Sequence, residues 1–218
     1  MANPVWDPVN TSGFKWRYAS TPKKVSELLP YFYNDLKSYG DPSVAGRIIA
    51  GILKCVAIGE EKFQQAFGGW TPESNEFGMA PLRPVHVDIN NNRWRWADGT
   101  SASVNWSAED SFIDSFSLGS DELILVYGYF NLEPVPNTLE LFFQPGSEKL
   151  PIWTIEPMRV KKEPYFIFPK PIIIEPRSQF YVAASTKSLT TSVTEEAGLL
   201  GYIFAPKSKL IAKVRVVS

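Results

Sequence analysis

Two hydrophobic patterns divide the chain, one typical of helices and one typical of strands. Between residues 21 and 69, apolar side chains recur at helical spacing, whereas after Pro84 apolar and polar positions alternate. The final segment shows the alternation well, with Leu210, Ala212 and Val214 pointing one way and the residues between them the other. Strands with one buried and one solvated face alternate in this way. The pattern therefore predicts a helical N-terminal part followed by antiparallel sheet.

Cap-and-proline signals mark the starts of two helices. Thr21-Pro22 and Asp41-Pro42 each place an N-cap residue before a proline at the first helical position. The first helix is predicted over residues 22–38, with a break at Pro30, and the second over residues 42–67. Gly68-Gly69 is predicted to stop the second helix.

The second helix has one charged stripe and an otherwise apolar circumference. Arg47, Lys54 and Glu61 recur every seven residues and fall on one side of the helix. The remaining positions are mostly branched or aliphatic, which predicts a helix covered on most sides. Its cover would be its own sandwich, neighbouring subunits or a membrane surface.

Ten short strands are predicted after the helices, separated by Pro, Gly, Asn and Asp turn residues. This arrangement is typical of an all-β sandwich rather than of alternating strands and helices. We therefore divide the chain into an extended arm (1–20), a helical segment (21–69), a linker (70–84) and a sandwich domain (85–218). The predicted strands are Val85–Ala97, Ala102–Ser107, Ser111–Leu118, Glu122–Leu132, Thr138–Gln144, Leu150–Glu156, Tyr165–Ile174, Gln179–Ser185, Leu199–Ala205 and Lys209–Val217.

The arm carries aromatic residues without a helical or strand period. Trp6, Phe14, Trp16 and Tyr18 lie among polar residues and prolines, so they cannot form a core by themselves. Exposed apolar groups of this kind mark interaction sites. We predict that these four residues mediate assembly, with packing against the arm's own sandwich as the alternative.

A basic cluster overlaps the arm. Lys15, Arg17, Lys23 and Lys24 accompany the aromatic residues, as in segments that contact phosphates. We expect these cations to contact a protein partner or, weakly, nucleic acid.

Composition narrows the possible chemistry. The 218-residue chain has 44% hydrophobic residues, a net charge of −1, one cysteine and one histidine. An intramolecular disulfide and the usual zinc ligand sets are therefore excluded, and no metal or cofactor is expected. The first residues show no basic-then-apolar leader, and the apolar run Val44–Gly59 contains Arg47 and Lys54. We expect neither export nor a transmembrane segment.

The sequence offers weak candidates for a catalytic or glycan-binding site. His86 is the only histidine that could serve as the base of a hydrolase triad, and no nucleophile motif accompanies it. Trp94 and Trp96 lie two apart on a predicted strand, so both rings emerge on one face. They could stack on a sugar or fill the core between two sheets. We expect no enzymatic activity; a pair of carboxylates acting on glycans stays as a third choice.

Two segments carry a resemblance to a known class of protein. Residues 165–185 read YFIFPKPIIIEPRSQFYVAAS, and residues 123–146 read LILVYGYFNLEPVPNTLELFFQPG. Their pattern resembles the jelly-roll capsid and decoration proteins of viruses that infect prokaryotes, and the likeness covers residues 85–218. It implies an eight-stranded, two-sheet jelly-roll sandwich in a closed shell, with the arm and helices reaching neighbouring subunits.

The resulting expectation is a virion structural protein, as a capsid, minor capsid or decoration subunit. Such a subunit would form homo-oligomers, contact other virion proteins and be made in the host cytoplasm before it enters the virion. A lectin-like sandwich that binds carbohydrate is the alternative function.

Overall fold

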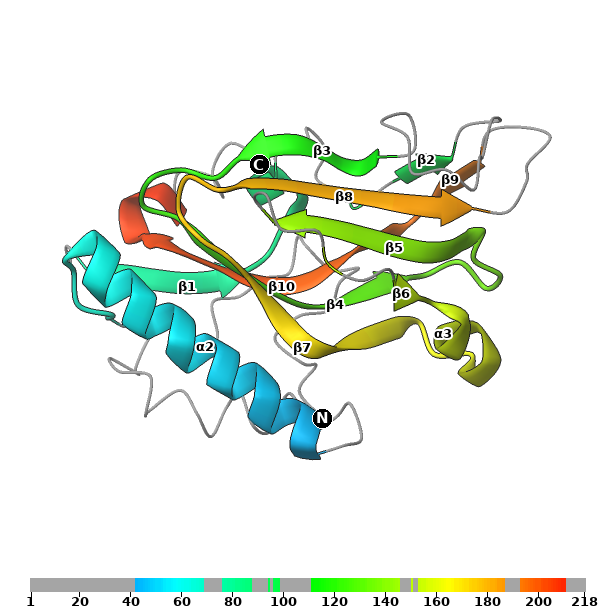
Figure 1. Cartoon of the computed structure of the whole chain (residues 1–218), viewed down its shortest axis with the longest axis horizontal. Helices are drawn as coiled ribbons and strands as arrows, with labels where there is room; N and C mark the ends of the chain where they lie inside the picture. Colours follow the sequence, from blue (N-terminus) through cyan, green and yellow to red (C-terminus); the bar gives the residue numbers. More distant parts are fainter. Residues whose placement is uncertain are drawn as a thin grey trace.

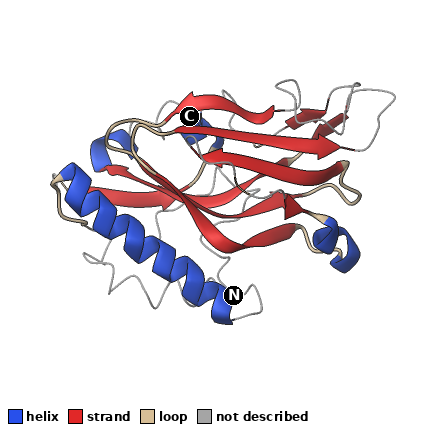
Figure 2. Ribbon diagram, viewed as in Figure 1, coloured by secondary structure: helices blue, strands red, loops and turns tan. Residues whose placement is uncertain are grey.

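Two antiparallel sheets and a long helix make up the computed structural model of the chain (Figures 1 and 2). The structure describes residues 42–68, 76–87, 94, 96–98, 111–145, 150, 153–186 and 193–210. The fold is mainly β and sandwich-like, as the sequence predicts. The predicted helix over residues 22–38 and the predicted strand Ala102–Ser107 lie outside the described residues.

Each of the two main sheets has four strands. The first has the order β1 (Phe77–Pro81), β10 (Ala197–Pro206), β4 (Leu123–Asn131) and β7 (Tyr165–Ile174). The second has the order β3 (Ser111–Ser117), β8 (Gln179–Thr186), β5 (Thr138–Pro145) and β6 (Trp153–Thr154). A short ribbon pairs β2 (Trp96–Asp98) with β9 (Val193–Glu195).

Aromatic side chains fill the space between the sheets. Phe143 on β5 meets Phe168 on β7 edge to face, with ring centroids 5.2 Å apart, and lies 6.1 Å from Phe180 on β8. All three rings are buried. Because Phe143 and Phe168 belong to different sheets, their contact fastens one sheet to the other.

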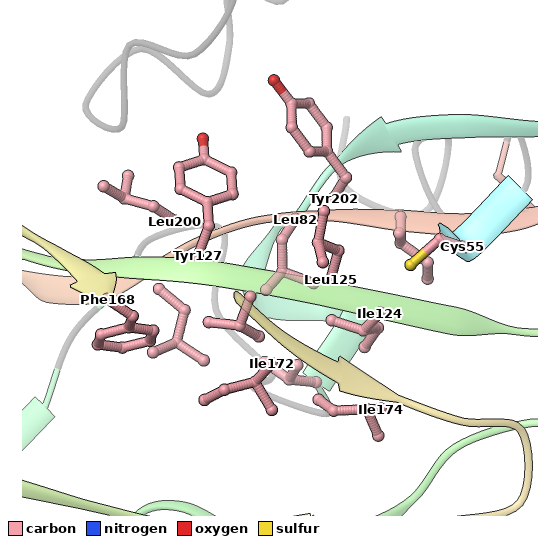
Figure 3. Close-up of a cluster of buried hydrophobic side chains, with 14 of the residues drawn as sticks. Cys55, Leu82, Ile124, Leu125, Tyr127, Phe168, Ile172, Ile174, Leu200 and Tyr202 are labelled. Carbon is pink, nitrogen blue, oxygen red and sulfur yellow. The ribbon is translucent and has the colours of Figure 1, made fainter. Parts of the chain in front are cut away.

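The central strands of the first sheet are covered on both faces. Every residue of β4 is buried, and so is every residue of β10 except its last. Figure 3 shows Tyr127 and Tyr202 on one side of this sheet, and Phe168 and Ile174 on the other. This is why β4 and β10 read as continuous apolar runs and not as alternating ones.

Helix α2 (Pro42–Phe63) supplies part of the outer cover by packing across β4, β7 and β10 (Figure 1). Its buried positions include Ile48, Ile52 and Cys55, which share one face. Gly59 permits the closest approach, since a Cβ there would lie 2.7 Å from the Phe77 ring.

Within one chain the helix is covered on one face only, which corrects the prediction that its own sandwich covers most of its sides. Arg47, Lys54 and Glu61 are exposed as predicted, but Ala50 is exposed too, and Leu53 is 44% exposed. One sheet touches only one face of a straight helix, whatever the apolar content of the other positions.

Helix α2 also ends four residues before the predicted end at Phe67. Gln64 follows the helix with a φ of 53°, a left-handed conformation that commonly ends helices. Phe67 instead forms a bridge to Phe77 on β1.

Length and composition alone would allow α2 to cross a membrane, because an 18-residue window has a mean hydropathy of 1.5. In the fold its most apolar face lies against the sheet, with Ile48 and Ile52 almost fully buried.

Strand β7 contains a large bulge at the edge of the first sheet. Val126 pairs with Ile172 and Gly128 with Ile167, so one residue of β4 faces four residues of β7. The bulge includes Pro169, Lys170 and Pro171. Prolines cannot donate backbone hydrogen bonds, so they protect this edge from pairing with another strand.

Several predicted elements are corrected by the structure. The predicted linker 70–84 contains β1, and the strand expected from Val85 begins instead as a 3₁₀ helix, η2 (Pro84–Val87). Helix α3 (Glu156–Lys161) follows β6, where no helix was predicted. A helical turn covers residues 207–210, so the predicted strand Lys209–Val217 does not begin at Lys209, and its residues 211–217 lie outside the described residues. These segments are short, so contacts outside them outweigh their local propensity.

The packing of α2 predicts unequal costs for two adjacent substitutions. Ile52 is fully buried and Leu53 is 44% exposed. Ile52→Ala should lower the free energy of unfolding by about 2–5 kcal/mol, because it leaves a cavity under the helix, whereas Leu53→Ala should cost less than about 1 kcal/mol. Urea denaturation followed by circular dichroism measures both. Equal losses would contradict the assigned buried face.

Candidate functional site

The residues predicted to mediate assembly lie outside the described residues. This applies to Trp6, Phe14, Trp16 and Tyr18, and to the basic residues Lys15, Arg17, Lys23 and Lys24. Their roles therefore stay predictions.

Trp94 is part of the core. Its side chain is only 3% exposed and meets Phe130 edge to face at a centroid distance of 6.5 Å. Gly198 makes room for the ring, since a Cβ at that position would lie 2.5 Å from it. Trp94 thus has no open face for a sugar. Trp96 begins β2, and its side chain is outside what the structure describes.

The single histidine is held in a structural turn. His86 is 2% exposed and lies on η2, not on the strand that its sequence context predicts. Its Nδ1 accepts a hydrogen bond of 3.0 Å from the backbone N–H of Arg83, and the backbone N–H of His86 donates to the Arg83 carbonyl. These reciprocal bonds use the imidazole to close the turn.

Burial also suppresses the chemistry of the single cysteine. Desolvation raises the pKa of the Cys55 thiol to about 12, and nearby Lys54 offsets only part of this effect. Burial likewise lowers the pKa of Arg83, and burial together with Glu163 raises the pKa of Tyr165. The thiolate is the reactive form of cysteine, so Cys55 is a core residue and not a nucleophile.

A buried carboxylate forms the most connected polar cluster in the described part of the chain. Glu195, at the end of β9, is fully buried. Its Oε2 accepts hydrogen bonds from Asn131 Nδ2 at 2.9 Å and from Thr138 Oγ1 at 2.7 Å, and its Oε1 accepts one from the backbone N–H of Asn137. Tyr129 joins the cluster through a 3.1 Å bond from Asn131 Nδ2 to its hydroxyl.

This cluster ties together segments that are distant in sequence. Asn131 ends β4 and Thr138 begins β5, so the carboxylate on β9 holds both ends of the β4–β5 connection. The donors are neutral groups that a buried carboxylate needs in place of water. Sequence reasoning missed Glu195, because no local motif brings it to Asn131. We interpret the cluster as a structural anchor.

An open cleft of about 670 Å³ lies between the exposed side of α2 and the bulge of β7. Helix α2 contributes one wall, and β7, with the end of β5, the other. Cationic side chains line it at Arg47, Lys54 and Lys170, while Pro171 and Ile173 are among the residues of its apolar surface.

One end of the cleft is fastened by an ion pair. Lys62 Nζ lies 2.6 Å from Glu175 Oε2, which joins the last turn of α2 to the end of β7. Both side chains are about half exposed, so the pair adds little stability. It does neutralise Glu175, the only carboxylate among the described lining residues, which together carry an excess of positive charge.

Within the described ranges, no three His, Cys, Asp or Glu side chains are grouped so that they could hold a metal ion. No protein-family model matches the chain. Comparison with curated proteins also gives no significant match. The cleft and the Glu195 cluster are therefore interpreted from their own geometry.

The Glu195 anchor predicts a large cost for removing its carboxylate. Glu195→Ala should lower the free energy of unfolding by about 3–5 kcal/mol, because two buried donors and one half-buried donor lose their acceptor. Glu196→Ala is the matched control, since this neighbour is half-buried and contributes its backbone carbonyl to Leu132. Denaturant unfolding of both variants provides the comparison, and a small loss for Glu195→Ala would exclude an anchoring role.

The shifted pKa of Cys55 predicts slow reaction with thiol reagents. At pH 8, a pKa of about 12 leaves roughly one thiol in ten thousand ionised. Labelling by an aromatic disulfide reagent should be slow in the native protein and fast in denaturing guanidinium chloride, as monitored by absorbance. Rapid labelling of the native protein would show that α2 opens readily from the sheet.

Proposed function

We propose that the two sheets are the halves of a jelly-roll sandwich. Support comes from nested strand pairs: β1 pairs with β10, β2 with β9, β3 with β8, β4 with β7, and β5 with β6. Each pair lies inside the previous one along the chain, so the ten strands follow the path of one long hairpin. Wrapping such a hairpin into two four-stranded sheets gives the jelly roll, with its two Greek keys.

The other strand pairs in the two sheets are also those that a wrapped hairpin would form. β10 also pairs with β4, and β8 also pairs with β5, which places the outer strands of the hairpin beside inner ones in each sheet. The chain passes between the sheets from β3 to β4, from β4 to β5, from β6 to β7 and from β7 to β8. Strand propensity acts within each strand, so it does not by itself explain four connections that pass from one sheet to the other.

From this topology we infer a structural role in a virus particle. The nested pairing carries the inference, because viral capsid domains are a major class of jelly rolls. In this proposal the chain is a capsid, minor capsid or decoration subunit without enzymatic activity. It associates with copies of itself and with other virion proteins, after synthesis in the host cytoplasm.

Burial removes Trp94 from the candidate sugar contacts of the lectin-like alternative. A lectin site through Trp94 needs an accessible ring, and that ring is packed on Phe130. Lectins share the jelly-roll architecture, so assembly is the property that distinguishes the two proposals.

The arm is the proposed source of assembly. Its four aromatic residues, Trp6, Phe14, Trp16 and Tyr18, would form an apolar patch if left in water. A symmetric particle buries the same patch in every copy, which multiplies its contribution without a second type of partner.

Replacing these four aromatic residues with serine should abolish assembly while the sandwich stays folded. Light scattering after size-exclusion chromatography measures the oligomer, and negative-stain microscopy shows whether particles form. The matched control replaces Lys15, Arg17, Lys23 and Lys24 with glutamine, which should leave assembly intact.

The basic-residue variant also separates two roles of the arm. If these cations contact the genome, co-purifying nucleic acid should fall, as read from the absorbance ratio at 260 and 280 nm. A wild-type protein that stays monomeric at every concentration and binds glycans on an array would instead favour the lectin-like alternative.

A further inference from the structure

We propose that the cleft between α2 and the bulge of β7 binds an extended peptide segment from another protein chain, one that carries spaced carboxylates among apolar side chains. The inference goes beyond a role in a virion and holds for any function of the sandwich. Three properties of the cleft carry it: its length, its separated cations and the chemistry of its surface.

The cleft is long enough for a short extended segment. Its lining residues on α2 run from Arg47 to Ile58. At about 1.5 Å per residue this distance is roughly 16 Å along the helix axis, or about five residues of extended chain. The volume of about 670 Å³ lies within the range of specific ligand sites.

The positive charges are spaced along the cleft. Arg47 and Lys54 lie two turns apart on the helix, roughly 10 Å along its axis. Lys170 adds a third cation from the opposite wall, on the β7 bulge. Carboxylates about three residues apart on an extended chain can meet both helix cations at once.

The apolar part of the surface indicates a peptide and not a nucleic acid. Among the residues that the structure describes, the lining includes Pro169, Pro171, Ile172 and Ile173 but no aromatic residue. Single-stranded nucleic acids bind where aromatic rings stack on the bases, whereas this surface suits aliphatic side chains.

The two prolines also determine how the segment is recognised. Because Pro169 and Pro171 lack backbone N–H groups, an added segment cannot continue the sheet ladder along this part of β7. Side-chain contacts and charge pairing would therefore provide the specificity.

Fluorescence anisotropy of a labelled heptapeptide tests the proposal on the full-length protein. The probe has glutamate at its second and fifth positions and valine or serine elsewhere. It should bind, and its affinity should fall as salt screens the cations. The same peptide with lysine at those two positions should not bind.

Two sets of variants test the location of binding. Lys54→Glu combined with Lys170→Glu should weaken binding by about tenfold or more, because it reverses two rim charges. Ala50→Trp should weaken binding to a similar extent by filling the cleft, without any change of charge. Lys161→Glu on α3 and Ala57→Trp on α2 are the matched controls, since both residues are exposed and lie outside the lining. Circular dichroism confirms that each variant is folded.

Three outcomes would overturn the proposal. The first is equal binding of the acidic and basic peptides. The second is unchanged binding in both cleft variants, which would place the peptide elsewhere. The third is displacement of the acidic peptide by laurate or by a ten-residue oligothymidylate at lower concentration. That result would assign the cleft to an anionic amphiphile or to nucleic acid, respectively.

Discussion

The central strands β4 and β10 are apolar on both faces, so both faces must be covered. The rest of the structure depends on this requirement. The second sheet covers one side, where Phe143, which also contacts Phe180, meets Phe168. Helix α2 covers part of the other, where Gly51 lies close to Leu125 and Gly59 close to Phe77. Removal of either layer would expose continuous apolar strands, which are prone to aggregate. The helix is thus a layer of the fold, not an appendage to the sandwich.

This layer arrangement also produces the cleft. A helix laid across a twisted sheet contacts it over one face only, and the bulge of β7 raises Pro169, Lys170 and Pro171 beside the helix. The space between them is lined by aliphatic groups that neither element covers. Arg47 and Lys54 at the rim of the cleft are charged and remain in water. They give this space a positive charge. A feature that protects the sheet edge therefore also shapes a binding surface.

The nested pairing of strands leaves backbone groups at the ends of the sandwich that need hydrogen-bond partners. Connections such as β4–β5 cross from one sheet to the other and carry backbone groups that the ladders cannot satisfy. Glu195 meets this demand at one crossing by accepting bonds from Asn131, Asn137 and Thr138. The anchor stabilises a register that long-range pairing makes slow to find during folding. In the proposed particle, such fixed ends would present the same surface in every copy.

The sequence by itself determined the elements that local chemistry specifies. Tyr165–Ile174 was predicted with the bounds that β7 has, because turn residues flank a β-branched run, and the proline signal at residue 42 gave the start of α2. The sequence could not place Glu195 beside Asn131, 64 positions away, nor show that Leu53 lies partly in water while Ile52 does not. The tertiary structure alone decided these features. Periodicity records which residues can share a face, whereas burial, ion pairing and the shape of the cleft depend on which distant element that face meets.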